Sequence, residues 1–178
     1  MDTDKLNLTE QDIQILLHRH INSGFCTPNS MVYGWESDLL HVRRSLWVTE
    51  YEIKLTTRDF RADSKKTYSF FNPEAENIYV LSKYDLLMDA TRSRPNRMIY
   101  VCPQGVIPVE ELPGFCGLIE VRPWGGPPWE TLRDFECVTV KKSKVLHKDK
   151  IQVGDLYQIA SSLEHRYWSV KRLLGEKK

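Results

Sequence analysis

Three ionisable residues, Asp38, Glu52 and Lys54, have types and spacing that could support metal-dependent chemistry. Glu52 and Lys54 are two residues apart, so on a β-strand they project from the same face. Asp38 shares that face if its segment pairs antiparallel with theirs, because directly opposite residues project to one side. Two carboxylates about 5 Å apart repel each other unless a cation lies between them. The spacing therefore predicts a cation site beside a lysine.

The ligand types indicate which ion this site would hold. Oxygen-only ligands suit a hard ion such as Mg²⁺ or Mn²⁺, and Mg²⁺ typically binds one or two carboxylates, several waters and substrate phosphate. Water bound to the ion is more acidic, and Lys54 could orient it or stabilise negative charge on the phosphate. This chemistry predicts hydrolysis of a phosphodiester bond in nucleic acid. The alternative interpretation is a cross-strand cluster of surface salt bridges.

The elements that must position these residues are two strands, predicted at about 32–42 and 46–55. Asp38 lies opposite Glu52 if a three-residue loop, 44–46, joins the strands, whereas a two-residue loop would need a compensating bulge. Glu50 is an extra acid on the charged face of the second strand, and it could be a metal ligand or a solvated or salt-bridged side chain. That face carries Val48, Glu50, Glu52 and Lys54, and the opposite face carries Trp47, Thr49, Tyr51, Ile53 and Leu55.

Two capping boxes predict the helices on either side of this hairpin. Thr9 and Asp12 begin a helix over about 10–21, with Glu10 at the edge of its apolar stripe. Glu10 could favour the positive helix N-terminus or point at the active site. Thr56 and Asp59 begin a helix that continues to about residue 67. Its exposed side carries Arg58, Arg61, Lys65 and Lys66, which could be a DNA-phosphate face or a solvated flank.

The remaining elements are predicted from apolar runs and turn residues. Residues 22–31 are expected to be a turn-rich connection. A last helix begins near residue 153 or 155 and carries a regular apolar stripe to Leu174, so we expect it to pack on the body. Further strands are expected at 77–81, 97–101, 117–121 and 135–140, a helix at 84–90, a helical turn at 109–112 and an exposed basic run at 141–150.

Composition limits the classes of protein that this chain can be. The 178 residues suit one domain, and 41% hydrophobic with 28% charged residues is ordinary for a globular protein. The net charge of +1 means that a nucleic-acid partner would be met by a local patch. Four widely spaced cysteines indicate reduced thiols and a cytoplasmic protein. We expect no membrane segment, because no apolar run approaches the roughly 20 residues that a span requires.

The arrangement of Asp38 followed by Glu52-Ile53-Lys54 resembles the PD-(D/E)XK nuclease superfamily. The flanking segments 35–40, 48–54 and 59–63 are similar to its MmcB-like branch, which is linked to DNA repair and also found among phage proteins. Segments 96–105 and 117–119 are similar to later strands of that branch. The resemblance covers about residues 9–121, and the sequence departs from the nominal pattern in lacking a proline before Asp38.

The resemblance implies an α/β fold with a mixed central sheet flanked by helices, a restriction-endonuclease-like core. It implies metal ligation by Asp38, Glu52 and the carbonyl of Ile53, and a catalytic role for Lys54. Glu10 would match the acidic residue that many members carry on their first helix. The chain is expected to be one nuclease-like domain, 1–178, with its core at about 9–121 and a strand and helix extension at about 122–178.

These observations lead to one principal functional prediction and two alternatives. The principal prediction is a Mg²⁺- or Mn²⁺-dependent deoxyribonuclease acting in DNA repair, recombination or phage DNA processing, in the cytoplasm of a bacterium or a phage-infected host. Its partner would be DNA, and a homodimer or a larger repair or phage assembly is compatible with the sequence. The alternatives are a DNA-binding nuclease-like protein without activity and a structural or adaptor protein, whose mark would be a large apolar surface without metal affinity.

Overall fold

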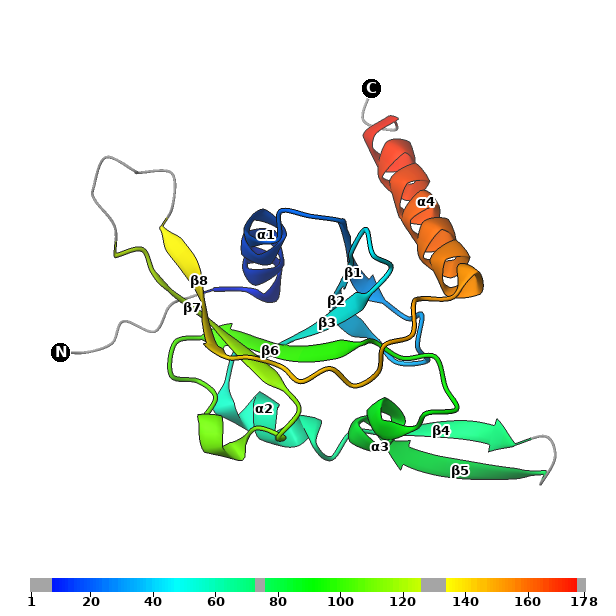
Figure 1. The fold of residues 1–178 in the computed structure, drawn as a ribbon. Helices are drawn as coiled ribbons and strands as arrows, with labels where there is room; N and C mark the ends of the chain where they lie inside the picture. The colour runs from blue at the N-terminus through cyan, green and yellow to red at the C-terminus, as the bar shows by residue number, and fades with distance from the viewer. Residues whose placement is uncertain (1–7, 73–75, 126–133, 176–178) are drawn as a thin grey trace.

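The computed structural model describes residues 8–72, 76–125 and 134–175 (Figure 1). Its main sheet has six strands in the order β1-β2-β3-β6-β7-β8. The pairs β3/β6 and β6/β7 are parallel, and the other three pairs are antiparallel, which confirms the expected α/β fold with a mixed sheet. A separate hairpin contains β4 (Thr67–Asn72) and β5 (Asn77–Ser82). The sheet strands are β1 (Phe25–Ser30), β2 (Ser37–Val42), β3 (Val48–Ile53), β6 (Arg97–Pro103), β7 (Gly117–Pro123) and β8 (Phe135–Lys141).

Helices cover both faces of the sheet, with α1 on one face and α2 and α3 on the other (Figure 1). Ile13 and Leu17 of α1 pack against Leu39, Tyr51 and Ile53. The opposite face packs against the buried residues of α2 and α3, among them Phe60, Leu86 and Leu87. The helices are α1 (Glu10–His20), α2 (Thr57–Asp63), α3 (Lys83–Met88), the 3₁₀ turn η1 (Val109–Glu111) and α4 (Val153–Gly175).

The loop between β2 and β3 has the three residues that the sequence required. Arg43 N–H donates to the Trp47 carbonyl at 2.9 Å, so these two residues close the hairpin around 44–46. Leu46 adopts a left-handed conformation with φ of 66°, as expected for the last residue of such a loop. The register pairs Leu40 with Glu50 and Val42 with Val48. The predicted register is therefore confirmed, and it needs no bulge.

Local sequence signals explain where the short helices begin. Thr9 and Asp12 form the expected capping box at α1, with both reciprocal hydrogen bonds present. Thr56 caps α2 by accepting a hydrogen bond from the Asp59 N–H. Ser82 and Asp85 form another capping box at α3. This cap fixes the start of α3 at Lys83, one residue before the helix that we expect over 84–90.

Two predictions between 22 and 67 are wrong. Residues 25–30, expected in a turn-rich connection, form β1 at the edge of the sheet. An edge strand tolerates Pro28 because only one of its sides must supply ladder hydrogen bonds. The helix expected to reach residue 67 ends at Asp63. The N–H groups of Lys65 and Lys66 bond three residues back in turns, and Thr67 then begins β4.

The prediction that α4 packs on the body is confirmed for part of the helix. Ile159 is buried, and Leu156 and Leu163 pack against the main core cluster. Tyr167 and Leu174, which continue the same stripe, are 55% and 63% exposed. Within the described part of the chain, no helix has the length and apolar character needed to cross a membrane.

Candidate active site

The β2–β3 hairpin places Asp38 and Glu52 on the same face. Extending the register from the pairs Leu39–Tyr51 and Leu40–Glu50 puts Asp38 directly opposite Glu52. The Asp38 Oδ2 accepts a hydrogen bond from the Ile53 N–H at 2.6 Å, which holds this carboxylate against β3. The structure therefore brings together the two carboxylates and the Ile53 backbone that the sequence singled out.

The charged face of β3 lies inside the protein, not at its surface. Glu50, Glu52 and Lys54 are 0%, 2% and 2% exposed. Buried charges require partners, because removing an ionised group from water is costly. Lys54 Nζ lies 2.7 Å from Glu52 Oε1 and 2.9 Å from Asp63 Oδ1. These contacts exclude a solvated surface cluster and leave a buried ion-pair network.

A second buried lysine, Lys83 on α3, joins the same network. Its Nζ lies 2.7 Å from Glu50 Oε1 and also contacts Glu52 Oε2. Trp35 Nε1–H donates to the same Glu50 oxygen at 2.9 Å. Glu50 is therefore a salt-bridged residue, one of the interpretations that the sequence left open.

Lys83 was not predicted as part of this site, although the sequence contains a signal for it. Lys83 precedes Leu86 and Leu87 by three and four residues, so it belongs to the buried face of α3. A lysine on the buried face of a helix requires a carboxylate partner, and Glu50 had no assigned counter-ion. Considering these two residues together would have predicted their contact.

Asp63 at the end of α2 completes the network on the side of Lys54. It accepts a hydrogen bond from the Tyr100 hydroxyl at 2.7 Å, and its Oδ1 lies 3.0 Å from Lys66 Nζ. Burial alone would raise the pKa of Asp63, but Lys54 outweighs it and holds that pKa at about 2. Asp63 is therefore ionised at neutral pH and fixes Lys54 beside Glu52.

Opposing effects act on Lys54. Burial alone would lower its pKa, but Glu52 and Asp63 raise that pKa above its ordinary value. Lys54 is therefore a permanent cation in this site. A lysine in this state suits stabilisation of negative charge better than removal of a proton from water.

Asp38 has the opposite electrostatic environment. Burial, the nearby Glu52 and Glu10 raise its pKa to about 7, although the Ile53 N–H and Lys54 act in the other direction. Across residues 8–72, 76–125 and 134–175, no Lys, Arg or His nitrogen lies within 4.0 Å of an Asp38 oxygen. Among the described residues, this carboxylate therefore lies near other negative charges without an ion pair of its own.

Glu10 reaches the same end of the hairpin from α1. Gln14 Nε2 donates to Glu10 Oε1 at 3.1 Å and to the Asp38 carbonyl at 2.9 Å, and so bridges the helix and the strand. Glu10 also lies in the first turn of α1, where a carboxylate favours the helix dipole. Both proposed roles of Glu10 are compatible with this position.

The formal charges around Glu52 do not balance. Five carboxylates surround three ammonium groups, which leaves two excess negative charges when every group is ionised. One divalent cation would neutralise that excess, and the donors are all oxygens, as Mg²⁺ prefers. The carboxylates belong to Glu10, Asp38, Glu50, Glu52 and Asp63, and the ammonium groups to Lys54, Lys66 and Lys83.

The geometry also places a condition on metal binding. In the part of the chain that the structure describes, no three Asp, Glu, His or Cys residues form a ready metal-binding group. Lys54 binds one oxygen of Glu52 and Lys83 binds the other. Asp38 makes no ion pair among the described residues, whereas Glu52 must first exchange a lysine contact to bind an ion. The residues therefore fit a divalent ion in donor type and charge, with a rearrangement at Glu52.

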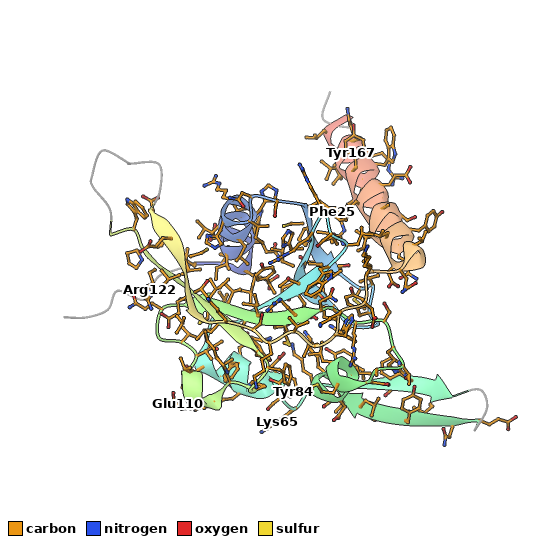
Figure 2. The ribbon with its side chains drawn as sticks, in the orientation of Figure 1. Phe25, Lys65, Tyr84, Glu110, Arg122 and Tyr167 are labelled. Atoms are coloured by element: carbon orange, nitrogen blue, oxygen red, sulfur yellow. The ribbon has the colours of Figure 1, made fainter. Side chains whose placement is uncertain are left out.

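The four basic residues expected to form a nucleic-acid face do not share one environment. Arg61 pairs with Glu111 of η1, with an Nη2–Oε1 distance of 2.7 Å. Lys66 leans toward the site and lies 3.8 Å from Glu52 Oε1. Arg58 and Lys65 are exposed, and Lys65 lies on the same side of the sheet as Tyr84 of α3 (Figure 2). Arg58 and Lys65 can thus meet an anion near the site, while Arg61 and Lys66 already have carboxylate partners.

Comparison with models of known protein families gives no match, and comparison with curated proteins also gives none. Among solved structures, the chain is similar to the SPO1766 protein of unknown function from Silicibacter pomeroyi. The TM-score is 0.60 at 15% sequence identity, and the match covers 96% of this chain and 97% of that chain. At this identity the likeness shows a shared fold over nearly the whole length of both proteins.

Proposed function

We propose that this protein is a Mg²⁺- or Mn²⁺-dependent nuclease of the PD-(D/E)XK type that hydrolyses phosphodiester bonds in DNA. The observation that supports this proposal best is the juxtaposition of Asp38, Glu52 and Lys54 in a buried cluster with excess negative charge. A buried ion-pair network built only for stability would be expected to balance its charges.

Asp38, Glu52 and the Ile53 carbonyl would hold the ion, with Glu10 close enough to Asp38 to support it. When bound, a divalent ion supplies a more acidic water and neutralises charge on the phosphate. Lys54 remains protonated between Glu52 and Asp63 and contributes positive charge where the phosphate becomes more negative. Asp63 and Tyr100 hold Lys54 in place through the contact at Asp63.

Exposed basic side chains on the α2 side of the sheet would meet the DNA backbone. Lys66 lies beside the cluster, and Arg58 and Lys65 are close to it in sequence on or just after α2. Phosphate contacts of this kind position a substrate without reading its sequence. We place this activity in DNA repair, recombination or phage DNA processing, in the cytoplasm of a bacterium or a phage-infected cell.

The decisive experiment changes Asp38→Asn and measures cleavage of plasmid, single-stranded DNA and RNA with Mg²⁺ or Mn²⁺. Asp38 forms no ion pair with the residues that the structure describes, so this change removes a metal ligand without leaving a buried lysine uncompensated. A bound metal ion stabilises the transition state by about several kcal/mol, so its loss should lower the rate of cleavage about 100-fold or more. Glu36→Gln is the matched control, because Glu36 is exposed and close in sequence. Equal cleavage by the Asp38 variant and the wild type would contradict the proposal.

A second candidate function is a structural or adaptor role in a repair or phage assembly. The observation in its favour is the exposed apolar half of α4, where Leu173 and Leu174 are 64% and 63% exposed. Exposed apolar patches of this kind mark interaction sites in soluble proteins. An inactive DNA-binding nuclease-like protein remains a further alternative. Titration with Mn²⁺ separates these candidates, since only the nuclease proposal requires metal affinity.

A further inference from the structure

Lys83 lies between Glu50 and Glu52 and has no part in the proposed nuclease chemistry. Its Nζ lies 2.7 Å from Glu50 Oε1 and also contacts Glu52 Oε2. The residue is 2% exposed, so its ammonium group depends on these two carboxylates in place of water. Burial alone would lower the pKa of Lys83, but Glu50 and Glu52 raise that pKa above its ordinary value. Lys83 therefore supplies a permanent positive charge between two buried acids.

The start of α3 fixes where this ammonium group lies. Lys83 is the first residue of α3 and directly follows Ser82, the N-cap of its capping box. Leu86 and Leu87, three and four residues later, are both 0% exposed and belong to the main core cluster. Lys83 thus reaches the two acids from a helix that is held by its cap and by its apolar face.

Glu50 has more capacity to bind a cation than Lys83 uses. Trp35 Nε1–H donates to Glu50 Oε1 at 2.9 Å, and Lys83 contacts the same oxygen. Glu50 Oε2 is buried and has no hydrogen-bond partner among the described residues. A buried polar atom without a partner is costly, so it calls for an explanation beyond stability. Carboxylate oxygens from Glu50 and Glu52, oriented toward one point, are the donors that a hard divalent ion prefers.

We propose that the Lys83 ammonium group occupies the position of a second divalent ion, between Glu50 and Glu52. This inference rests on the proposed function, in which the first ion is held by Asp38 and Glu52. The two ions of two-metal phosphodiesterases lie about 3.5–4 Å apart, a separation that the two oxygens of one carboxylate can bridge. Glu52 would bridge in this way, with the first ion at one oxygen and Lys83 at the other.

The ammonium group differs from a metal ion in what it contributes. It supplies one positive charge where a divalent ion would supply two, and it cannot bind a water molecule and make it more acidic. It also repels a cation that approaches the same oxygens. Because Lys83 keeps Glu52 Oε2, the contact that Glu52 exchanges for the first ion is the one between Oε1 and Lys54. Lys54 remains paired with Asp63 after this exchange.

Counting bound Mn²⁺ in the full chain, without DNA, tests this proposal. Electron paramagnetic resonance measures free Mn²⁺ while the metal is added to protein that has been treated with EDTA and then freed of it. Lys83→Ala removes the ammonium group and opens space for an ion with its waters, so this variant should bind one ion more than the wild type. The double change Glu50→Gln with Lys83→Ala is the matched control. It opens the same space beside a single carboxylate and should bind as many ions as the wild type.

The outcomes separate this inference from the proposed function. One ion in the wild type and one in Lys83→Ala would overturn the inference alone and make Lys83 a plain buried salt bridge. A control that also gains an ion would overturn it as well. No bound ion in either protein would overturn the proposed function together with the inference.

A second variant and a second measurement address the loss of a buried cation. Lys83→Met also removes the charge but keeps most of the side-chain volume, which limits the disturbance of the core around α3. An ion that binds only the folded state stabilises it by mass action. Saturating Mn²⁺ should therefore raise the midpoint of thermal unfolding more for Lys83→Met than for the wild type. An equal or smaller rise for the variant would overturn the proposal.

Discussion

Two regions of this protein reverse the usual distribution of polarity. The face of β3 that holds Glu50, Glu52 and Lys54 is buried, although each of these residues carries a charge. The C-terminal half of α4 is exposed, although Val170 and Leu174 are apolar. In most folded proteins charged side chains are exposed and large apolar side chains are buried. Both reversals therefore indicate surfaces built for something other than the stability of the isolated chain.

The two regions differ in whether contacts inside the molecule compensate their unusual side chains. The buried charges are compensated inside the molecule, since Lys54 and Lys83 each contact two carboxylates. The exposed apolar side chains of α4, Tyr167, Val170 and Leu174, have no such compensation among the described residues. A buried ion pair binds its partners tightly, whereas an exposed apolar stripe is available to another molecule. The following tests separate these two situations, beginning with the largest expected effect.

Replacing Lys83→Met should destabilise the protein more than any other single change in the cluster that preserves side-chain volume. It leaves Glu50 and Glu52 buried without one of their cations, and breaking a buried pair in this way costs about 3–5 kcal/mol. Chemical denaturation measures the change in the free energy of unfolding. Lys65→Met is the matched control, because Lys65 is exposed and should shift that free energy by less than about 0.5 kcal/mol. Equal effects of the two changes would show that the network does not stabilise the fold.

The two halves of α4 should respond differently to truncation of a side chain. Ile159 is 2% exposed, so Ile159→Ala should lower the free energy of unfolding by about 2–5 kcal/mol. Leu174→Ala, at 63% exposure, should lower it by less than about 0.5 kcal/mol when measured at concentrations where the chain is monomeric. Denaturation of both variants at low protein concentration tests the difference. A large effect of Leu174→Ala would mean that the C-terminal end of α4 packs on the body.

The pH dependence of stability should reveal the raised pKa of the Asp38 carboxyl. Its pKa is about 7 in the folded protein against 3.8 as the ordinary value, so the folded state binds more protons between these limits. Stability must therefore decrease as pH rises from about 4 to about 7. Asp63 acts in the other direction at lower pH, because its pKa of about 2 makes its contribution disappear only as pH falls toward that value.

Unfolding measured in EDTA across this pH range, for the wild type and for Asp38→Asn, isolates the contribution of Asp38. The difference in stability between the two proteins should change from about pH 4 to about pH 7 and then level off. Saturating Mn²⁺ should reverse the decrease for the wild type alone. A difference that is constant with pH would show that Asp38 has an ordinary pKa and no excess negative charge around it.

Much of the fold could be predicted from local sequence. The capping box at Thr9, the apolar runs of β6 and β7 and the single helical turn at 109–111 follow from neighbouring residues. The polar strand β1 was missed because its pairing with β2, rather than its own composition, makes it a strand. The early end of α2 was missed for a similar reason, since the pairing of β4 with β5 takes over from Thr67.

The candidate site could likewise be predicted only in part from the sequence. Sequence spacing determined that Asp38, Glu52 and Lys54 share a face, because the period of a strand and the length of a three-residue loop fix which side chains lie together. Only the tertiary structure decided which cations meet them. Lys83 lies 31 residues after Glu52 and reaches it through the packing of α3 on the sheet.

Tertiary structure likewise decided the state of α4. The apolar spacing of the helix is continuous in the sequence, but the body covers only part of it. Leu163 packs on the core and Arg166 bonds the backbone of β1, whereas Leu174 is exposed. Periodicity determines which face of a helix is apolar, and only the arrangement of the other elements determines how far that face is covered. Burial and charge compensation depend on contacts between segments far apart in the chain, so they emerge only when the chain has folded.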